Sequence, residues 1–316
     1  MPASVLARRA AADLSVAATS GTVRGVILLT GATGTIGTAL LRRLIADGKQ
    51  VRCLVRDPRR LGPERVRVQI ALGDLSNPAS FRHALRGVDT VVHLAAAIRD
   101  QDTASIEELN AVATLRLLRA SERVGVKRFI FFSALGASLY SPSRFFRAKA
   151  LAERAVRDSA LDTVVFAPSI VYAPGDPWLR LLERMSWLPA MPVSGSGKAL
   201  YQPIWADDTA AATMAVLEGR RNGAEPIELA GPETLSHDQI VKTVLRSLGR
   251  RRRLLHIPLP LVHAGLWAVG AAVGTTSAFA TWEEAELMEI PMVSSRATAD
   301  AEALGVNPLR MSAVLG

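Results

Sequence analysis

Residues 26–37 read VILLTGATGTIG, and this stretch decides the fold. Its apolar start, residues 26–29, predicts a buried strand, and residues 34–47 predict the helix that follows. The glycines between them permit a tight turn, so backbone N–H groups at the helix N-terminus can face a pyrophosphate. The stretch therefore predicts a nucleotide-binding loop, with a tight turn that binds no ligand as the alternative. The residues predicted to bind are Gly31, Thr33, Gly34, Thr35, Ile36 and Gly37.

Short apolar runs continue to alternate with segments of helical period beyond this loop. Strands that are apolar on both faces and separated by helices imply a parallel sheet covered on both sides. Right-handed crossovers then predict an α/β, doubly wound Rossmann fold. Further strands are predicted at residues 51–55, 66–71, 90–94, 128–132 and 163–167, and helices at residues 105–124 and 143–159.

The regular alternation ends near Tyr172. We expect residues 25–175 to form the dinucleotide-binding core, with later returns near residues 200–232. Residues 176–316 are expected to form a smaller, mainly helical substrate or lid region. Residues 1–24 lack the continuous apolar centre of a secretory signal and predict a flexible extension, with a transit-peptide-like segment as the alternative.

Within the C-terminal region the sequence predicts a helix at residues 206–217 and a strand at residues 227–230. Asp207 and Asp208 are expected to cap the first of these elements. A further helix is predicted to begin at the capping box of residues 236–239 and to end near Gly249.

Composition excludes several classes of protein. The 316 residues are 49% hydrophobic and 21% charged, which excludes an intrinsically disordered chain. The single cysteine, Cys53, excludes a disulfide-stapled scaffold and a Cys-rich zinc module, and is expected to pack in the core. His93, His237, His256 and His263 show no metal-binding spacing, so no metal is expected. The net charge of +9 permits nucleic acid, an anionic membrane or a phosphorylated cofactor as partner.

The residue at the tip of the second strand indicates which of the two nicotinamide dinucleotides, NAD or NADP, is preferred. An acidic residue there binds the ribose hydroxyls of NAD, whereas Arg accommodates the extra phosphate of NADP. Arg56 occupies this position, with Arg59 and Arg60 three and four residues further on. NADP(H) is therefore the predicted cofactor, and the adjacent Asp57 keeps NAD(H) open.

Five further segments resemble motifs of the extended and atypical short-chain dehydrogenase/reductase superfamily. They read GDL at 73–75, VHLAA at 92–96, LNA at 109–111, APSIVYAPGD at 167–176 and QPIWADD at 202–208. The resemblance spans about residues 26–315, and its neighbours include NAD-dependent epimerases and dehydratases. It is closest to the branch of NmrA-like proteins and of the nucleotide-binding accessory subunit of respiratory complex I. The segments SPSRFFRAKA at 141–150 and LGVNP at 304–308 support this branch.

This resemblance implies which other residues line the cofactor. In the family, the turn after the third strand contacts the adenine, the end of the fourth strand runs beneath the cofactor, and the segment after the sixth strand borders the nicotinamide. The residues implied here are Asp74, Leu75, Leu94, Ala95, Ala96, Asn110, Lys149, Pro168, Ser169 and Ile170.

Active members of the superfamily pair a Tyr with a Lys four residues later and add a Ser from the fifth strand. The Tyr carries the proton, the Lys lowers its pKa and holds the ribose, and the Ser positions the substrate oxygen. Ser133 and Lys149 match this pattern, but Phe145 stands at the Tyr position and has no proton to transfer. Tyr140, on the preceding loop, is the alternative proton carrier.

The incomplete pattern predicts an NADP(H)-binding protein with impaired or absent hydride transfer. The cofactor would then have a structural, sensing or complex-associated role. The alternative is an active NADPH-dependent oxidoreductase, epimerase or dehydratase that uses Lys149 and Ser133 on a small carbonyl or nucleotide-sugar-like substrate.

Four arginines at residues 250–253 precede residues 254–281, which contain no Asp, Glu, Lys or Arg. We interpret the arginines as a solvated helix end and the apolar stretch as a buried or pocket-lining helix. Association with a protein complex or a membrane surface through residues 250–281 stays open, as does a spanning helix. Nucleic acid is not expected, because no recognition module or interleaved aromatic residues accompany the arginines. We expect a cytoplasmic protein, with peripheral contact at the inner face of a membrane as the open alternative.

Overall fold

Seven parallel strands form the central sheet of the chain. The computed structural model describes residues 25–101, 104–220, 225–264 and 282–316. The strands are β1 (Val26–Thr30), β2 (Val51–Val55), β3 (Gln69–Leu72), β4 (Val88–His93), β5 (Arg128–Phe132), β6 (Asp162–Pro168) and β11 (Ile227–Leu229). Their order in the sheet is β11-β6-β5-β4-β1-β2-β3, so the chain runs outward from β1 in both directions. This order confirms the predicted doubly wound Rossmann fold.

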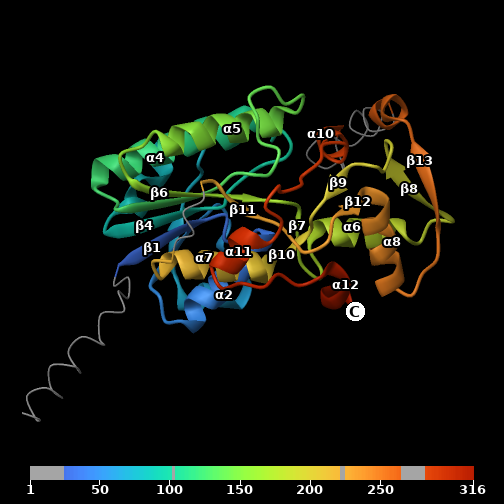
Figure 1. Cartoon of the computed structure of the whole chain (residues 1–316). Helices are drawn as coiled ribbons and strands as arrows, with labels where there is room; N and C mark the ends of the chain where they lie inside the picture. The colour runs from blue at the N-terminus through green and yellow to red at the C-terminus, as the bar shows by residue number, and fades with distance from the viewer. Residues whose placement is uncertain (1–24, 102–103, 221–224, 265–281) are drawn as a thin grey trace, which may run out of the picture.

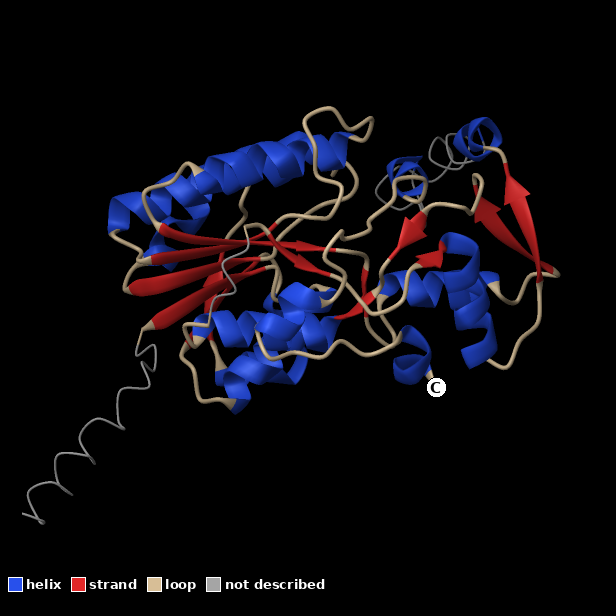
Figure 2. Cartoon of the chain, in the orientation of Figure 1, coloured by secondary structure: helices blue, strands red, loops and turns tan. Residues whose placement is uncertain are grey.

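Helices cover both faces of this sheet, as the apolar strands require. The segments α4 (Ala113–Val124) and α5 (Arg144–Arg157) lie on one face, and α2 (Thr35–Ala46), α7 (Ala206–Leu217) and α11 (Ala299–Ala303) lie on the other (Figures 1 and 2). Successive side chains of a strand point to opposite faces. Ile27 and Leu29 therefore join the core under α2 and α7, while Leu28 joins the core under α4 and α5.

Two predicted elements differ from the structure near the edge and the centre of the sheet. Residues 58–67, of which the last two were predicted as strand, form a 3-10 segment (Pro58–Arg67), and Val66 is 82% exposed. The long helix predicted over residues 105–124 contains a π-helical turn, Glu108–Val112, directly before α4. A π-turn inserts one extra residue per turn, which no apolar periodicity reveals.

The smaller lobe contains strand pairs as well as helices. The helices are α6 (Pro177–Met185), α8 (His237–Ser247), α10 (Trp282–Leu287) and α12 (Met311–Leu315). The strands β8 (Ala190–Ser194) and β13 (Arg253–Ile257) pair in parallel, and β9 (Leu200–Tyr201) and β12 (Leu235–Ser236) pair antiparallel. This lobe has its own core, which includes Tyr172, Met191, Tyr201, Ile240 and Leu245. The Ser236 capping box of α8 is present as predicted.

The two lobes are joined by a short pair of parallel strands. The strand β7 (Val171–Tyr172) pairs with β10 (Ile204–Trp205), after which α7 and β11 return the chain to the larger lobe. The helix α7 is fixed there by Asp207, which accepts two hydrogen bonds from Arg43 of α2, one of them at 2.8 Å.

The predicted caps of α7 are wrong. Trp205 occupies the N-cap position and makes no side-chain capping bond. Asp207 binds Arg43, and Asp208 Oδ2 accepts a hydrogen bond from the Leu309 N–H at 2.9 Å. Both carboxylates therefore tie distant segments to the helix, and their position in its first turn also suits its dipole.

The predicted solvated helix end at residues 250–253 is also wrong. The helix α8 ends at Ser247, and Arg253 opens β13, opposite Ala190 of β8. The apolar stretch beyond Ala264, up to residue 281, and the extension of residues 1–24 lie outside the described residues. Among the described helices, none has the length and apolar character needed to cross a membrane.

Candidate functional site

Three glycines of the loop after β1 differ in what surrounds them. Gly31 has φ +73°, and a Cβ there would lie 2.6 Å from the backbone N of Ala95. A Cβ at Gly37 would lie 2.1 Å from the carbonyl oxygen of Gly31. At Gly34 the nearest atom to such a Cβ is 3.4 Å away, and the residue is exposed. The fold itself therefore requires Gly31 and Gly37, whereas Gly34 leaves open space in front of α2.

The N-terminus of α2 faces this open space without a cap. Gly34 is its N-cap residue, no side chain accepts from its first N–H groups, and no acidic residue lies in its first turn. Two helices of the smaller lobe differ, because Asp176 caps α6 and Ser236 caps α8. Uncapped N–H groups and the positive end of a helix dipole form a site for an anion, and a pyrophosphate fits it.

Two charged residues, Arg56 and Asp57, lie at the tip of β2, and only the carboxylate has a hydrogen-bond partner in the described part of the chain. Arg56 is exposed and makes no hydrogen bond or ion pair with the described residues. Asp57 Oδ1 accepts from the Arg59 N–H at 3.0 Å and so caps the 3-10 segment that follows. At the tip of β3, Asp74 Oδ1 accepts from the N–H and hydroxyl of Ser76, both at 2.9 Å, in the turn that contains Leu75.

The segment after β4 packs against the glycine loop and is held in place by hydrogen bonds from Asn110. Asn110, 1% exposed, donates through Nδ2 to Ala97 O at 2.7 Å and to Ile106 O at 2.8 Å. Its Oδ1 accepts from the Ala97 N–H at 3.2 Å. Both polar atoms of the Asn110 side chain are thus used in hydrogen bonds to the backbone. Asn110 therefore positions the segment that contains Leu94, Ala95 and Ala96 and does not itself contact a ligand.

His93, the last residue of β4, connects this strand to β1 and to α4. Its two ring nitrogens lie 2.6 Å from Thr30 Oγ1 and 2.9 Å from Thr114 Oγ1. Burial, with a smaller contribution from Lys149, lowers the pKa of His93 to about 3. The imidazole is therefore neutral, and its two hydrogen bonds give it a structural role.

Lys149 lies on α5 one turn after Phe145, as the spacing predicts. Its side chain is buried, and Nζ donates to Phe132 O at 2.6 Å. Nζ also lies 5.0 Å from the centre of the Phe131 ring and 5.8 Å from that of Phe145. Burial lowers the pKa of Lys149 to about 7. The amine therefore exchanges a proton near neutral pH, but the aromatic ring beside it offers no second proton carrier.

Ser133 is buried nearby but has a different partner. Its hydroxyl donates to Glu153 Oε2 at 2.6 Å. Glu153 follows Lys149 by four residues on α5 and is not among the predicted site residues, although the i, i+4 spacing places both side chains on one helix face. Tyr140 is 95% exposed, so its phenol lies in solvent rather than beside Lys149.

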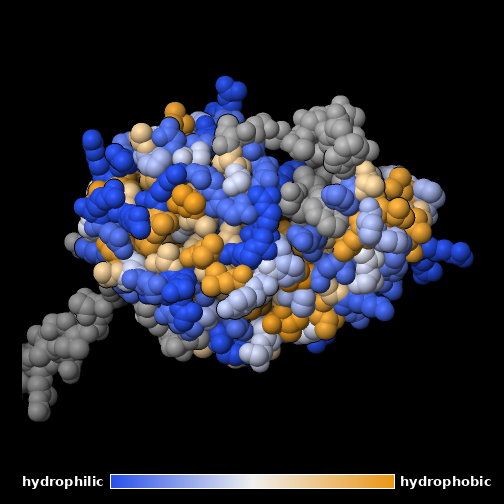
Figure 3. Space-filling model, turned by 90° about the horizontal axis from the view of Figure 1, so that it is seen from above, coloured by the Kyte–Doolittle hydropathy of each residue, from blue (hydrophilic) through white to orange (hydrophobic). Residues whose placement is uncertain are grey.

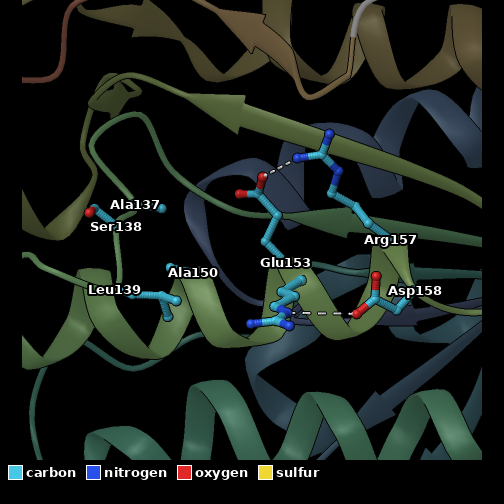
Figure 4. A pocket seen from close by; sticks show the side chains of 8 residues that line it. Ala137, Ser138, Leu139, Ala150, Glu153, Arg157 and Asp158 are labelled. Atoms are coloured by element: carbon cyan, nitrogen blue, oxygen red, sulfur yellow. Dashed lines mark hydrogen bonds and ion pairs between the residues drawn. The ribbon is translucent and has the colours of Figure 1, made fainter.

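A surface pocket of about 380 Å³ lies between α5 and the loop that follows β5 (Figure 4). Glu153 lies at its edge and forms an ion pair with Arg157 at 3.4 Å. Its lining consists of Ala137, Ser138, Leu139, Ala150, Glu153, Arg154, Arg157 and Asp158. Neither the glycine loop nor Phe145 contributes to this lining, so the pocket is separate from the predicted cofactor site.

An apolar wall lies on the other side of Phe145. Ala134, Phe146 and Leu287 form a buried cluster, against which Phe145 and Met292 pack together with Met288 and Ile290. Nearby, the Ser169 hydroxyl donates to Met292 O at 2.7 Å. The backbone of Pro168 accepts from the Leu135 N–H at 2.9 Å, and that of Ile170 accepts from the Ile204 N–H at 3.0 Å. The segment from residue 287 to residue 292 therefore closes the end of β5 and β6.

The buried Lys149 predicts a pH dependence of stability. Its pKa is about 7 in the folded chain and near 10.5 when unfolded, so the unfolded chain binds more protons between these values. The free energy of unfolding should therefore rise with pH from 7 to 9, by up to about 1.4 kcal/mol per unit. Urea unfolding should show this rise, and Lys149→Met should remove it.

Lys127→Met is the matched control, because the Lys127 side chain is 79% exposed. This variant should keep the slope of the unchanged chain. Equal slopes for the unchanged chain and Lys149→Met would contradict a neutral-pH titration of Lys149.

Comparison with known proteins agrees with this geometry. Residues 31–177 match the family model described as NAD(P)H-binding. The chain is 28% identical to ceramide reductase of Caulobacter vibrioides, with 87% of each chain covered. It is also 28% identical to NADH dehydrogenase [ubiquinone] 1 alpha subcomplex subunit 9, mitochondrial, of Arabidopsis thaliana, over 83% of this chain and 68% of the relative.

A solved structure shows the same fold over almost the whole chain. UDP-glucose 4-epimerase of Thermotoga maritima superposes with a TM-score of 0.70 at 19% identity, covering 92% of this chain and 96% of the epimerase. Residues 31–177 therefore match an NAD(P)H-binding domain, and the chain shares its Rossmann fold with this epimerase.

Proposed function

We propose that the chain binds NADP(H) and has little or no hydride-transfer activity, so that the cofactor has a structural, sensing or complex-associated role. The observation that carries the proposal is Phe145 at the Tyr position, beside the buried Lys149. A positioned proton donor contributes about 10²–10⁴-fold to such reactions. Bound NADP(H) would supply the hydride donor or acceptor, but no described side chain next to Lys149 supplies the accompanying proton.

The other polar groups support the same proposal. Ser133 donates to Glu153 and is not free to orient a substrate oxygen. Tyr140, at 95% exposure, would have to leave solvent to replace the missing phenol. In this proposal Lys149 holds the nicotinamide ribose by exchanging its bond to Phe132 O for bonds to the ribose hydroxyls. Pro168, Ser169 and Ile170 border the nicotinamide through their backbone.

Arg56 supports NADP(H) over NAD(H). Its guanidinium has no partner among the described residues and stands at the tip of β2, where the adenosine ribose would lie. Asp57, the acidic alternative, already accepts a backbone hydrogen bond from Arg59. In the same proposal Asp74 and Leu75 contact the adenine, and Leu94, Ala95 and Ala96 run beneath the cofactor.

A complex-associated role is supported by the relatives. The Arabidopsis thaliana relative is by name a subunit of NADH dehydrogenase, and the similarity covers 83% of this chain. We extend that association to this chain as part of the proposal, with the cofactor stabilising the larger lobe.

A second candidate is an active reductase that uses Lys149 as its only proton carrier. The lowered pKa of Lys149, about 7, favours it, because the neutral amine is present at neutral pH. A relative named ceramide reductase also supports it. The rate of NADPH oxidation distinguishes the two candidate functions, because only the active reductase turns over.

Arg56→Glu tests the cofactor preference. Loss of a charge-assisted bond to the 2′-phosphate should weaken NADPH binding roughly 10–100-fold, while NADH binding should change little. Fluorescence titration of the reduced dinucleotides measures both affinities. Arg67→Glu, an exposed arginine of the same segment, is the matched control and should bind like the unchanged chain. Equal weakening in both variants, or tighter NADH than NADPH binding before substitution, would overturn the preference.

Phe145→Tyr tests the proposed catalytic defect. NADPH oxidation with a panel of carbonyl compounds should be near background in the unchanged chain and should rise, by up to about 10²–10⁴-fold, when the phenol is restored beside Lys149. Phe145→Leu should stay at background, because it changes the ring without adding a proton carrier. Fast turnover by the unchanged chain, abolished by Lys149→Met, would refute the proposal and establish the second candidate.

A further inference from the structure

We propose that the end of the smaller lobe binds the surface of an anionic lipid bilayer. The surface consists of Trp187 and Leu188, which follow α6, and of residues 250–253, which lead into β13; we call it the Trp–Arg surface. This inference concerns a second face of the molecule and does not depend on the activity proposed above.

Two large apolar side chains of this surface are largely exposed to solvent. Trp187 is 72% exposed and Leu188 is 47% exposed, although both are large and apolar. Leu255, on the adjoining strand β13, is 56% exposed. In Figure 3 hydrophilic side chains project from the end of the smaller lobe next to apolar groups. Folding buries most large apolar side chains. Apolar side chains that stay exposed beside charged ones therefore mark a surface that binds a membrane or another partner.

The arginines are held around Trp187 by the chain itself. The Arg250 guanidinium stacks on the Trp187 ring at 3.7 Å from its centre and donates to Ser186 Oγ. Arg252 Nε donates to the carbonyl oxygens of Ser186 and Leu188, each at 3.0 Å. The parallel pairing of β13 with β8 begins at the next residue. The cations are therefore fixed next to the exposed indole before any partner binds.

The positive charge of this region is not neutralised within the described chain. None of the four arginines forms an ion pair with a carboxylate of the described residues. Residues 177–198 and 237–264, which build most of the smaller lobe, contain nine Lys and Arg but only Glu183 and Asp238 as acids. Asp238 is itself engaged by His256 at 2.9 Å. These two segments thus carry seven more positive than negative charges and attract an anionic surface.

A bilayer fits these features better than an acidic protein does. Trp prefers the interface between headgroups and hydrocarbon, and each Arg near an anionic leaflet adds electrostatic attraction. Leu188 and Leu255 offer aliphatic groups that an acidic peptide would leave unpaired. The sequence also continues from Arg253 into 28 residues without a charged side chain. Basic residues beside apolar ones are the pattern of peripheral membrane binding.

Vesicle flotation of the full chain tests the proposal. The unchanged chain should float with vesicles that contain phosphatidylglycerol, should not float with pure phosphatidylcholine vesicles, and should be released by high salt. The double variant Arg251→Glu, Arg253→Glu should lower the partition coefficient at least roughly tenfold, since both side chains are exposed. Trp187→Ser should lower it by a smaller factor without changing the charge.

Arg119→Glu, Arg123→Glu is the matched control, because both arginines are exposed on α4 of the larger lobe and the charge change is the same. It should float like the unchanged chain, and the thermal midpoints of all variants should agree, which excludes loss of fold. Equal loss in the control pair would reduce the effect to net charge and overturn the proposal. Binding to poly-glutamate, but to no vesicle, would overturn it in favour of an acidic protein partner.

Discussion

The backbone of Gly31 lies directly against the backbone of Leu94 and Ala95, and the geometry of the cofactor site depends on this contact. It exists because β4 pairs with β1 in the sheet, so the chain leaves both strands at the same edge. No side chain fits between the two segments, since a Cβ on Gly31 would lie 2.6 Å from Ala95 N. The turn at Gly31 then directs the N-terminus of α2 toward open space, and Asn110 holds the opposite segment in place from below.

In the function that we propose, one residue of α5 separates cofactor binding from chemistry. Lys149 is buried where an active relative would need it, but its neighbour Phe145 packs into an apolar wall with residues 287–292. Ser133 donates to Glu153, one helical turn beyond Lys149. The proposed pyrophosphate site at the glycine loop consists of backbone groups, so the side chains of Phe145 and Ser133 would not affect it. In this proposal, binding and turnover therefore depend on different parts of the chain.

Most of the fold could be predicted from the sequence because buried parallel strands leave a simple pattern. Runs such as residues 26–29 and 128–132 are apolar on both faces, and their order follows from right-handed crossovers. The errors arose where a side chain's partner is distant in sequence. Asp207 was predicted as a cap, but it binds Arg43, and that pairing exists only once α2 and α7 pack together. Residues 250–253 were placed at a helix end, but Arg253 pairs with β8, and the guanidinium groups of Arg250 and Arg252 bind the turn at Ser186.

The candidate site, like the fold, could be predicted from the sequence only where its residues are close together along the chain. The glycine loop and the Phe145–Lys149 spacing are local in sequence, so both were predicted. The Ser133–Glu153 bond joins a strand to a helix, and the exposure of Tyr140 depends on how its loop packs, so neither could be.

The most direct test of the account is dinucleotide binding by Gly34→Asp. Gly34 is the N-cap of α2, with φ −85° and ψ 177°, and a Cβ there meets nothing closer than 3.4 Å. Asp is a favoured N-cap residue, so the variant should unfold at the same temperature or slightly higher. Its carboxylate would occupy the place of the pyrophosphate, and titration calorimetry should show that NADPH binding is lost. Unchanged NADPH binding in a stably folded Gly34→Asp chain would contradict the account.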